Sequence, residues 1–144
     1  MTESLHIVCP HCHTTNRVQT AQLGSQPDCG SCHQPLFTGA PLALDATSFA
    51  KHVQRSHIPV LVDFWAPWCG PCRQMAPAFA PAARALEPQV RLAKLDTEAH
   101  PQVAAPYNIR SIPTMVLFKG GREVARISGA LGAADIERWV RSVL

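Results

Sequence analysis

Every cysteine in this chain belongs to a C-x-x-C pair, and this spacing constrains the fold more than any other feature. The 144-residue chain has six cysteines in three such pairs: Cys9/Cys12, Cys29/Cys32 and Cys69/Cys72. A C-x-x-C pair can bind a metal ion or cycle between a dithiol and a disulfide. The spacing alone does not distinguish these roles, so the surroundings of each pair must decide.

Composition indicates how large a core the chain can bury, and the first residues bear on its location. With 47% apolar residues, the chain can bury one core and carry a small appendage. The first ten residues, MTESLHIVCP, contain neither a basic start nor a long apolar stretch, so we expect no secretory signal and no membrane span. The predicted location is the reducing cytoplasm, where paired cysteines indicate metal sites or redox centres rather than structural disulfides.

The N-terminal residues differ in kind from the rest. Residues 1–36 contain four of the six cysteines and few large apolar side chains, so this segment needs a staple to fold. Residues 37–41, which include Gly39 and Pro41, are predicted to form a linker. Residues 42–144 are predicted to form the main domain.

In the main domain, apolar runs alternate with helical patterns. Strands are predicted from residue 42 and over 58–66, 90–96, 114–119 and 123–128. Helices are predicted before residue 56 and over 69–86, 99–106 and 132–144. Gly120-Gly121 predicts a hairpin turn between the last two strands. The alternation favours an α/β fold with a mixed β-sheet.

The third pair lies where a buried strand meets a helix. In the first helical turn, Cys69 and Cys72 share a face, so their sulfurs can form a disulfide. The helix N-terminus favours a thiolate at Cys69, which predicts that Cys69 is the nucleophile and Cys72 the resolving thiol. A metal site would need two further ligands, and no paired ligands follow downstream. Free structural cysteines are the other alternative.

Asp63 interrupts the apolar strand VLVDFW. A buried carboxylate is costly unless something compensates, and burial raises its pKa. Such a group could accept a proton from Cys72. A hydrogen-bonded, purely structural carboxylate is an equally good interpretation.

The first two pairs have the spacing C-x₂-C-x₁₆-C-x₂-C, as expected for a four-cysteine zinc site. Four thiolates leave the ion no open position, so one structural zinc is predicted, held by Cys9, Cys12, Cys29 and Cys32. A histidine could replace one ligand, the candidates being His11, His13 and His33. Two structural disulfides are another alternative, and the geometry would also suit iron.

Several separate motifs now point to one family. VDFWAPWCGPC, Pro77 in the following helix, RSIPT at 110–114 and GAL at 129–131 resemble the thioredoxin family over essentially all of 42–144. The resemblance implies a thioredoxin fold, a central mixed β-sheet flanked by helices. It also implies that Asp63 is the buried acid–base residue, with Lys94 near it.

The same resemblance implies a docking face for protein substrates. It predicts a cis peptide between Ile112 and Pro113 facing the active-site disulfide. It also implies an apolar patch beside Cys69, formed by Trp68, Ile112, Gly129 and Ala130. Gly-Pro between the cysteines resembles reducing members of the family, so a protein-disulfide reductase is predicted. The implied partners are disulfide-bearing proteins and an NADPH-dependent thioredoxin reductase, and we expect a monomer.

The order of the parts is similar to that of bacterial zinc-containing thioredoxins, the thioredoxin 2 group. A second hypothesis makes the N-terminal segment a zinc-controlled interaction module that responds to oxidation. A nucleic-acid-binding zinc ribbon is a third. It is disfavoured because Arg17 is the only cation among residues 1–40 and four thiolates with a divalent ion carry a net charge of −2.

Overall fold

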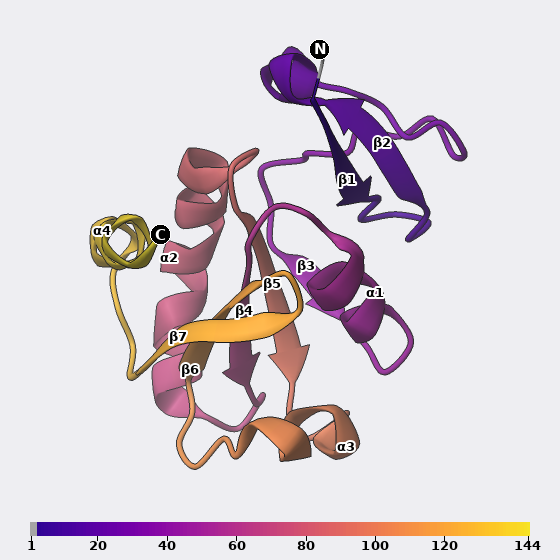
Figure 1. Cartoon of the computed structure of the whole chain (residues 1–144). Coiled ribbons are helices and arrows are strands. Elements are labelled where there is room, and N and C mark those ends of the chain that lie inside the picture. The colour runs from indigo at the N-terminus through magenta and orange to yellow at the C-terminus, as the bar shows by residue number, and fades with distance from the viewer. Residues whose placement is uncertain (1–2) are drawn as a thin grey trace.

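The computed structural model describes residues 3–144, which form two sheets of unequal size (Figure 1). The small sheet pairs β1 (Ser4–Val8) with β2 (Thr15–Gln19) in antiparallel fashion. The large sheet has five strands in the order β3-β5-β4-β6-β7. Its strands are β3 (Leu42–Leu44), β4 (Val60–Trp65), β5 (Arg91–Asp96), β6 (Thr114–Lys119) and β7 (Arg122–Ser128).

The large sheet is mixed, as the sequence predicts. Strand β5 pairs in parallel with β3 and β4, whereas β6 pairs antiparallel with both β4 and β7. The turn between β6 and β7 uses Gly120 and Gly121, both at positive φ, which glycine adopts without steric cost. The predicted α/β fold class is therefore confirmed.

Helices cover both faces of the large sheet (Figure 1). They are α1 (Ser48–Arg55), α2 (Gly70–Leu86), α3 (Pro101–Ala104) with the 3₁₀ turn η2 (Ala105–Tyr107), and α4 (Ala133–Val143). Helices α2 and α4 pack on the face that carries Leu61 of β4. Helix α1 and residue Ala104 pack on the opposite face, which carries Val62 and Phe64. In the part of the chain described, no helix has the length and apolar character to cross a membrane.

Strand β4 carries Asp63, a buried acidic residue. Successive side chains of a strand point to opposite faces, so Asp63 shares the face of Leu61, the one covered by α2. The strand ends at Trp65, and α2 begins five residues later at Gly70. The carboxyl end of β4, the start of α2 and the segment after β5 therefore gather at one end of the molecule, the lower end in Figure 1.

The N-terminal segment has more internal packing than the sequence indicates. Its hairpin and a 3₁₀ turn, η1 (Thr20–Ser25), were not predicted. A small apolar cluster joins Ile7, Val18 and Leu36 with two of the cysteines. The main domain contributes Ile58 to this cluster. Although large apolar side chains are few, as the sequence shows, the segment thus has a small core that it shares with the main domain. The boundaries at 36 and 41 stay predictions.

Candidate redox site and metal centre

Cys69 and Cys72 form a disulfide at the start of α2. Their Cα atoms are 5.3 Å apart, and the backbone N–H of Cys72 donates to Cys69 Sγ at 3.2 Å. Cys69 is the residue that precedes the helix, and Pro71 occupies the first turn, where a missing N–H costs little. Partial positive charge at a helix N-terminus stabilises a thiolate, so this pair is suited to thiol–disulfide exchange.

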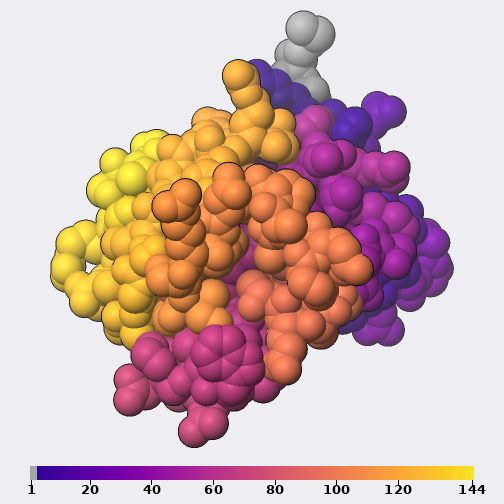
Figure 2. Space-filling model, turned by 90° about the horizontal axis from the view of Figure 1, so that it is seen from below, coloured from indigo at the N-terminus to yellow at the C-terminus, as the bar shows by residue number. Residues whose placement is uncertain are grey.

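The disulfide lies next to the segment that holds Ile112. Both cysteines are buried by Ala66, Trp65 and Ile112, and Cys69 Sγ lies 3.6 Å from the carbonyl oxygen of Ile112. Figure 2 looks at this end of the molecule, where the pink start of α2 borders the orange segment that follows β5.

The residues of the predicted docking patch differ in how exposed they are. Trp68 is 67% exposed and Ile112 is half-buried. The Ile112–Pro113 peptide is cis, which confirms that expectation. Gly129 donates its N–H to the carbonyl of Pro113 at 2.9 Å, and Ala130 follows it in an exposed position. Gly129 and Ala130 therefore border the segment that holds Ile112.

Asp63 is buried near the disulfide and lines the same pocket as Cys72. It is 5% exposed, and among the described residues its Oδ1 has no hydrogen-bond partner. Burial raises the pKa of Asp63 to about 7, while the charge of Lys94 opposes that rise. Lys94 is the register partner of Asp63 on β5, and its ammonium lies 5.6 Å from the centre of the Trp65 ring.

A small pocket of about 140 Å³ connects the carboxylate with the redox pair. It is lined by Asp63, Cys72, Lys94, Pro41, Trp65, Arg73, Ala76 and Phe79. Asp63 and Cys72 thus face the same space. A carboxyl with a pKa near neutrality in such a place can take up or release a proton.

The other four cysteines come together at the opposite end. The sulfurs of Cys9, Cys12, Cys29 and Cys32 all lie within 4.8 Å of one another, and none is in a disulfide. The cross-knuckle distances, Cys9 to Cys32 and Cys12 to Cys29, are both 3.6 Å. Tetrahedral Zn–S bonds of about 2.3 Å require sulfurs about 3.8 Å apart, so the cluster fits a zinc ion.

Backbone donors point at the first sulfur of each C-x-x-C pair. The N–H groups of His11 and Cys12 point at Cys9 Sγ at 3.3 and 3.5 Å. The N–H groups of Ser31 and Cys32 point at Cys29 Sγ at the same two distances. Each knuckle therefore offers the same pair of donors to its first cysteine. At Cys29 these hydrogen bonds, the one from Cys32 above all, lower the pKa of the thiol to about 6.

The histidines that could have replaced a ligand are engaged elsewhere or lie outside the cluster. His11 Nε2 contacts the carbonyl of Pro35 at 3.1 Å, and His13 Nδ1 contacts His52 Nε2 at 3.0 Å. His33 does not belong to the group of converging donors. The arrangement is therefore one of four cysteines positioned for metal binding.

Comparison with known proteins agrees with both sites. The family model described as Thioredoxin matches residues 40–142, and the zinc-ribbon model described as Thioredoxin 2, N-terminal matches residues 8–34. The chain belongs to the thioredoxin family. Members of this family are protein-disulfide oxidoreductases, and this thioredoxin carries a zinc-ribbon domain ahead of its WCGPC motif.

Individual relatives match over most of the chain. Thioredoxin C-3 of Corynebacterium nephridii is 48% identical over 134 residues, which cover 93% of this chain and 92% of the relative. Thioredoxin 1 of a Nostoc species is 49% identical over 108 residues, 75% of this chain and all of the relative. A bifunctional thioredoxin reductase/thioredoxin of Mycobacterium leprae is 43% identical over 106 residues, 74% of this chain but 23% of that protein.

Sequence reasoning missed the contacts between the two parts of this thioredoxin. Arg91 and Glu87 form a buried ion pair at their boundary, and His52 is buried against His13. Burial lowers the pKa of His52 to about 3, so it is neutral in its contact with His13. The contact of His52 with His13 has no sequence signature, because it depends on packing between distant elements. Glu87 and Arg91 are four residues apart, but this spacing does not show that the pair is buried or that it contacts Val8 and Gly39.

Proposed function

We propose that this thioredoxin reduces disulfides in other proteins through the Cys69–Cys72 dithiol. The observation that carries the proposal is the redox pair itself, which sits at a helix N-terminus beside the exposed Trp68 and the carbonyl of Ile112. The proposed location is the cytoplasm, where protein thiols are kept reduced. The proposed electron donor is NADPH, passed on by a thioredoxin reductase, and the working form is a monomer.

The proposed reaction has two exchange steps. The Cys69 thiolate attacks one sulfur of the substrate disulfide, forming a mixed disulfide and releasing the other substrate sulfur as a thiolate. The Cys72 thiolate then attacks Cys69 Sγ, so that the substrate leaves fully reduced and the Cys69–Cys72 disulfide forms. Two electrons have passed to the substrate, and the reductase restores the dithiol.

Asp63 is proposed to take the proton of Cys72 before the second step. The two groups line the same pocket, and a pKa near 7 lets the carboxylate accept a proton near neutral pH. Lys94 is proposed to keep part of the Asp63 population ionised, because its charge acts against the effect of burial. Both assignments rest on the pocket that Asp63, Cys72 and Lys94 line together.

The docking face is proposed to comprise Trp68, Ile112, Pro113, Gly129 and Ala130. Exposed tryptophan surface beside a reactive group is typical of residues that contribute strongly to protein–protein contacts. The backbone carbonyl of Ile112 lies near Cys69 Sγ, so a substrate backbone that pairs with this segment would bring its disulfide to the nucleophile.

The four remaining cysteines are proposed to hold one zinc ion. With four thiolate ligands a zinc site is closed, so its contribution is stability of the N-terminal segment rather than catalysis. The small shared core and the hairpin then depend on the metal.

The test is reduction of a protein disulfide by NADPH and a thioredoxin reductase, with the full-length chain as intermediary. Cys69→Ser should abolish turnover. Cys72→Ser is the matched variant: it also stops turnover but keeps the nucleophile, so it should accumulate a covalent mixed disulfide with the substrate. Turnover by Cys69→Ser at the wild-type rate would contradict the proposal.

A further inference from the structure

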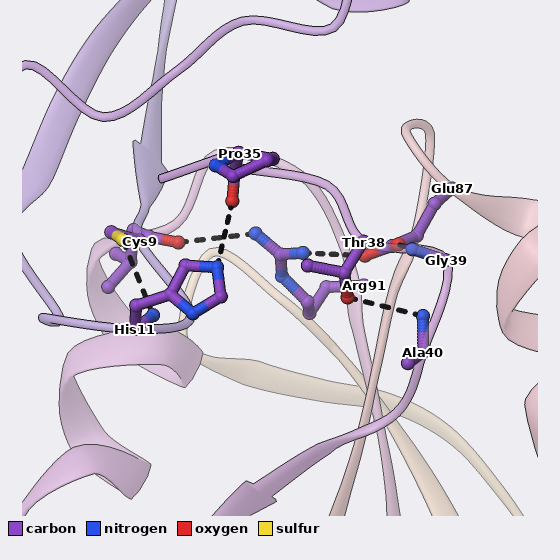
Figure 3. Close-up of polar contacts among 9 residues, drawn as sticks. Cys9, His11, Pro35, Thr38, Gly39, Ala40, Glu87 and Arg91 are labelled. Carbon is purple, nitrogen blue, oxygen red and sulfur yellow. Dashed lines mark hydrogen bonds and ion pairs between the residues drawn. The ribbon is translucent and has the colours of Figure 1, made fainter. Parts of the chain in front are cut away.

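Arg91, the first residue of β5, carries a buried charge at the boundary between the metal-binding segment and the thioredoxin domain (Figure 3). Its side chain is 2% exposed. A guanidinium so deeply buried requires partners, because it cannot lose its proton and water cannot reach it. One partner is Glu87 at the end of α2, whose Oε2 accepts from Arg91 Nη1 at 2.5 Å. The ring of Phe37 lies 4.9 Å from the guanidinium carbon.

The second nitrogen of the guanidinium reaches the first zinc knuckle. Arg91 Nη2 donates to the carbonyl oxygen of Val8 at 3.2 Å, and Val8 directly precedes the predicted ligand Cys9. Glu87 meanwhile accepts the N–H of Gly39 through Oε1 at 2.7 Å. The ion pair therefore holds the chain at two points, at Val8 just before the first cysteine and at Gly39 in the predicted linker.

The position of Arg91 also matters for the charge of the metal site. Four thiolates around a divalent ion carry a net charge of −2, and residues 1–40 supply a single cation, Arg17, which is exposed on β2. Arg91 and Glu87 together carry no net charge, but the guanidinium lies between Cys9 and Glu87 (Figure 3), so the positive end of the ion pair faces the cluster. Burial weakens the screening of this dipole by water. A purely structural purpose explains the ion pair poorly, since replacing a buried pair with well-packed apolar residues is often neutral or stabilising.

We propose that Arg91 is a positioning residue of the metal site, contributed by the thioredoxin domain. It orients Cys9 through the carbonyl of Val8 and turns the positive end of its ion pair with Glu87 toward the negative thiolate cluster. Groups in this outer shell of a metal site set the affinity for the ion. The inference rests on the proposed zinc site, and it makes zinc affinity depend on a residue outside the zinc ribbon.

The experiment measures zinc affinity of the full-length reduced protein by competition with a chromophoric chelator. The double variant Arg91→Met/Glu87→Met removes both charges together and keeps apolar volume at the boundary. We expect it to bind zinc about 10- to 100-fold more weakly than wild type, the usual loss when an outer-shell partner is removed. Arg91→Lys keeps a cation but cannot reach Glu87 and Val8 together, so it should also lose affinity, by a smaller factor.

Glu87→Gln is the matched control. Its amide oxygen can still accept from Gly39, and Arg91 keeps its charge and its contact with Val8. We expect a lower melting temperature with zinc affinity within about twofold of wild type. If the ion pair had only a structural role, zinc affinity would instead fall together with the melting temperature in Glu87→Gln as well.

The possible outcomes distinguish the role of Arg91 from the existence of the zinc site itself. Zinc affinity within about twofold of wild type in a folded Arg91 variant would overturn the role of Arg91, as would an equal loss in Glu87→Gln. Wild-type protein that binds no zinc would overturn the metal site itself. A loss in both Arg91 variants that Glu87→Gln does not share would support the inference.

Discussion

Replacing Asp63 with asparagine should stabilise the oxidised protein, and the gain should grow with pH. The side chain is 5% exposed and Oδ1 is without a partner among the described residues, so its ionised form is costly. Burial raises its pKa from 3.8 to about 7. Between these two values the native state keeps a proton that the unfolded chain has lost. Wild-type stability therefore falls as pH rises through this window.

The size of the effect follows from the same two values. A change from 3.8 to about 7, at about 1.4 kcal/mol per pH unit, is an upper limit of about 4 kcal/mol, reached above pH 8. At pH 5 the same calculation gives about 1.7 kcal/mol. Asparagine has nearly the shape of a protonated aspartate and cannot ionise, so Asp63→Asn should remove this penalty and little else.

The assay is urea unfolding of the oxidised, zinc-supplemented protein at pH 5, 6, 7 and 8, followed by tryptophan fluorescence. Any effect of pH on zinc binding is common to both proteins and cancels in their difference. Asp135→Asn is the control, since Asp135 is exposed on α4 and its change should stay within about 0.5 kcal/mol at every pH. A gain for Asp63→Asn that is absent at pH 8, or equal at pH 5 and pH 8, would refute the reasoning.

Three further predictions concern the docking face, the charge near Asp63 and the metal. Trp68→Ala should lower kcat/KM for a protein disulfide about tenfold, because an exposed anchor is lost, while reduction of a small-molecule disulfide stays unchanged; equal losses with both would contradict this. Lys94→Met should raise the pKa of Asp63 further, measured by NMR titration of its carboxyl carbon, and an unchanged or lower pKa would disagree. Stripping zinc with a chelator should remove hydrogen-exchange protection from β1 and β2 but leave β4 protected, and retained protection in all three would count against a structural metal.

The main domain could be predicted closely because local signals and tertiary packing agree there. The almost wholly apolar run at 58–66 becomes β4 with helices on both faces. The glycine pair at 120–121 makes the expected hairpin. Helix α2 runs from Gly70 to Leu86 although Pro77 and Pro81 lie inside it, since tertiary contacts hold it together.

The N-terminal segment was predicted less completely. The spacing of its cysteines indicates the ligand cluster, but no alternation of apolar residues marks the hairpin β1–β2 strongly enough to predict it. Its core depends on Ile58, and its anchoring depends on Arg91 and Glu87. Contacts between residues so far apart in the chain leave no trace in local spacing, which is why the contacts between the two parts could not be predicted.

The most direct test of the division of labour among the three pairs is a joint count of zinc and reactive thiols. The chain should be purified under reducing conditions without added metal, and the thiols titrated before and after zinc is removed in denaturant. We expect one zinc per chain, two thiols reactive in the native protein and six after denaturation, with the two native thiols at Cys69 and Cys72. No zinc and six thiols reactive in the native protein would contradict it.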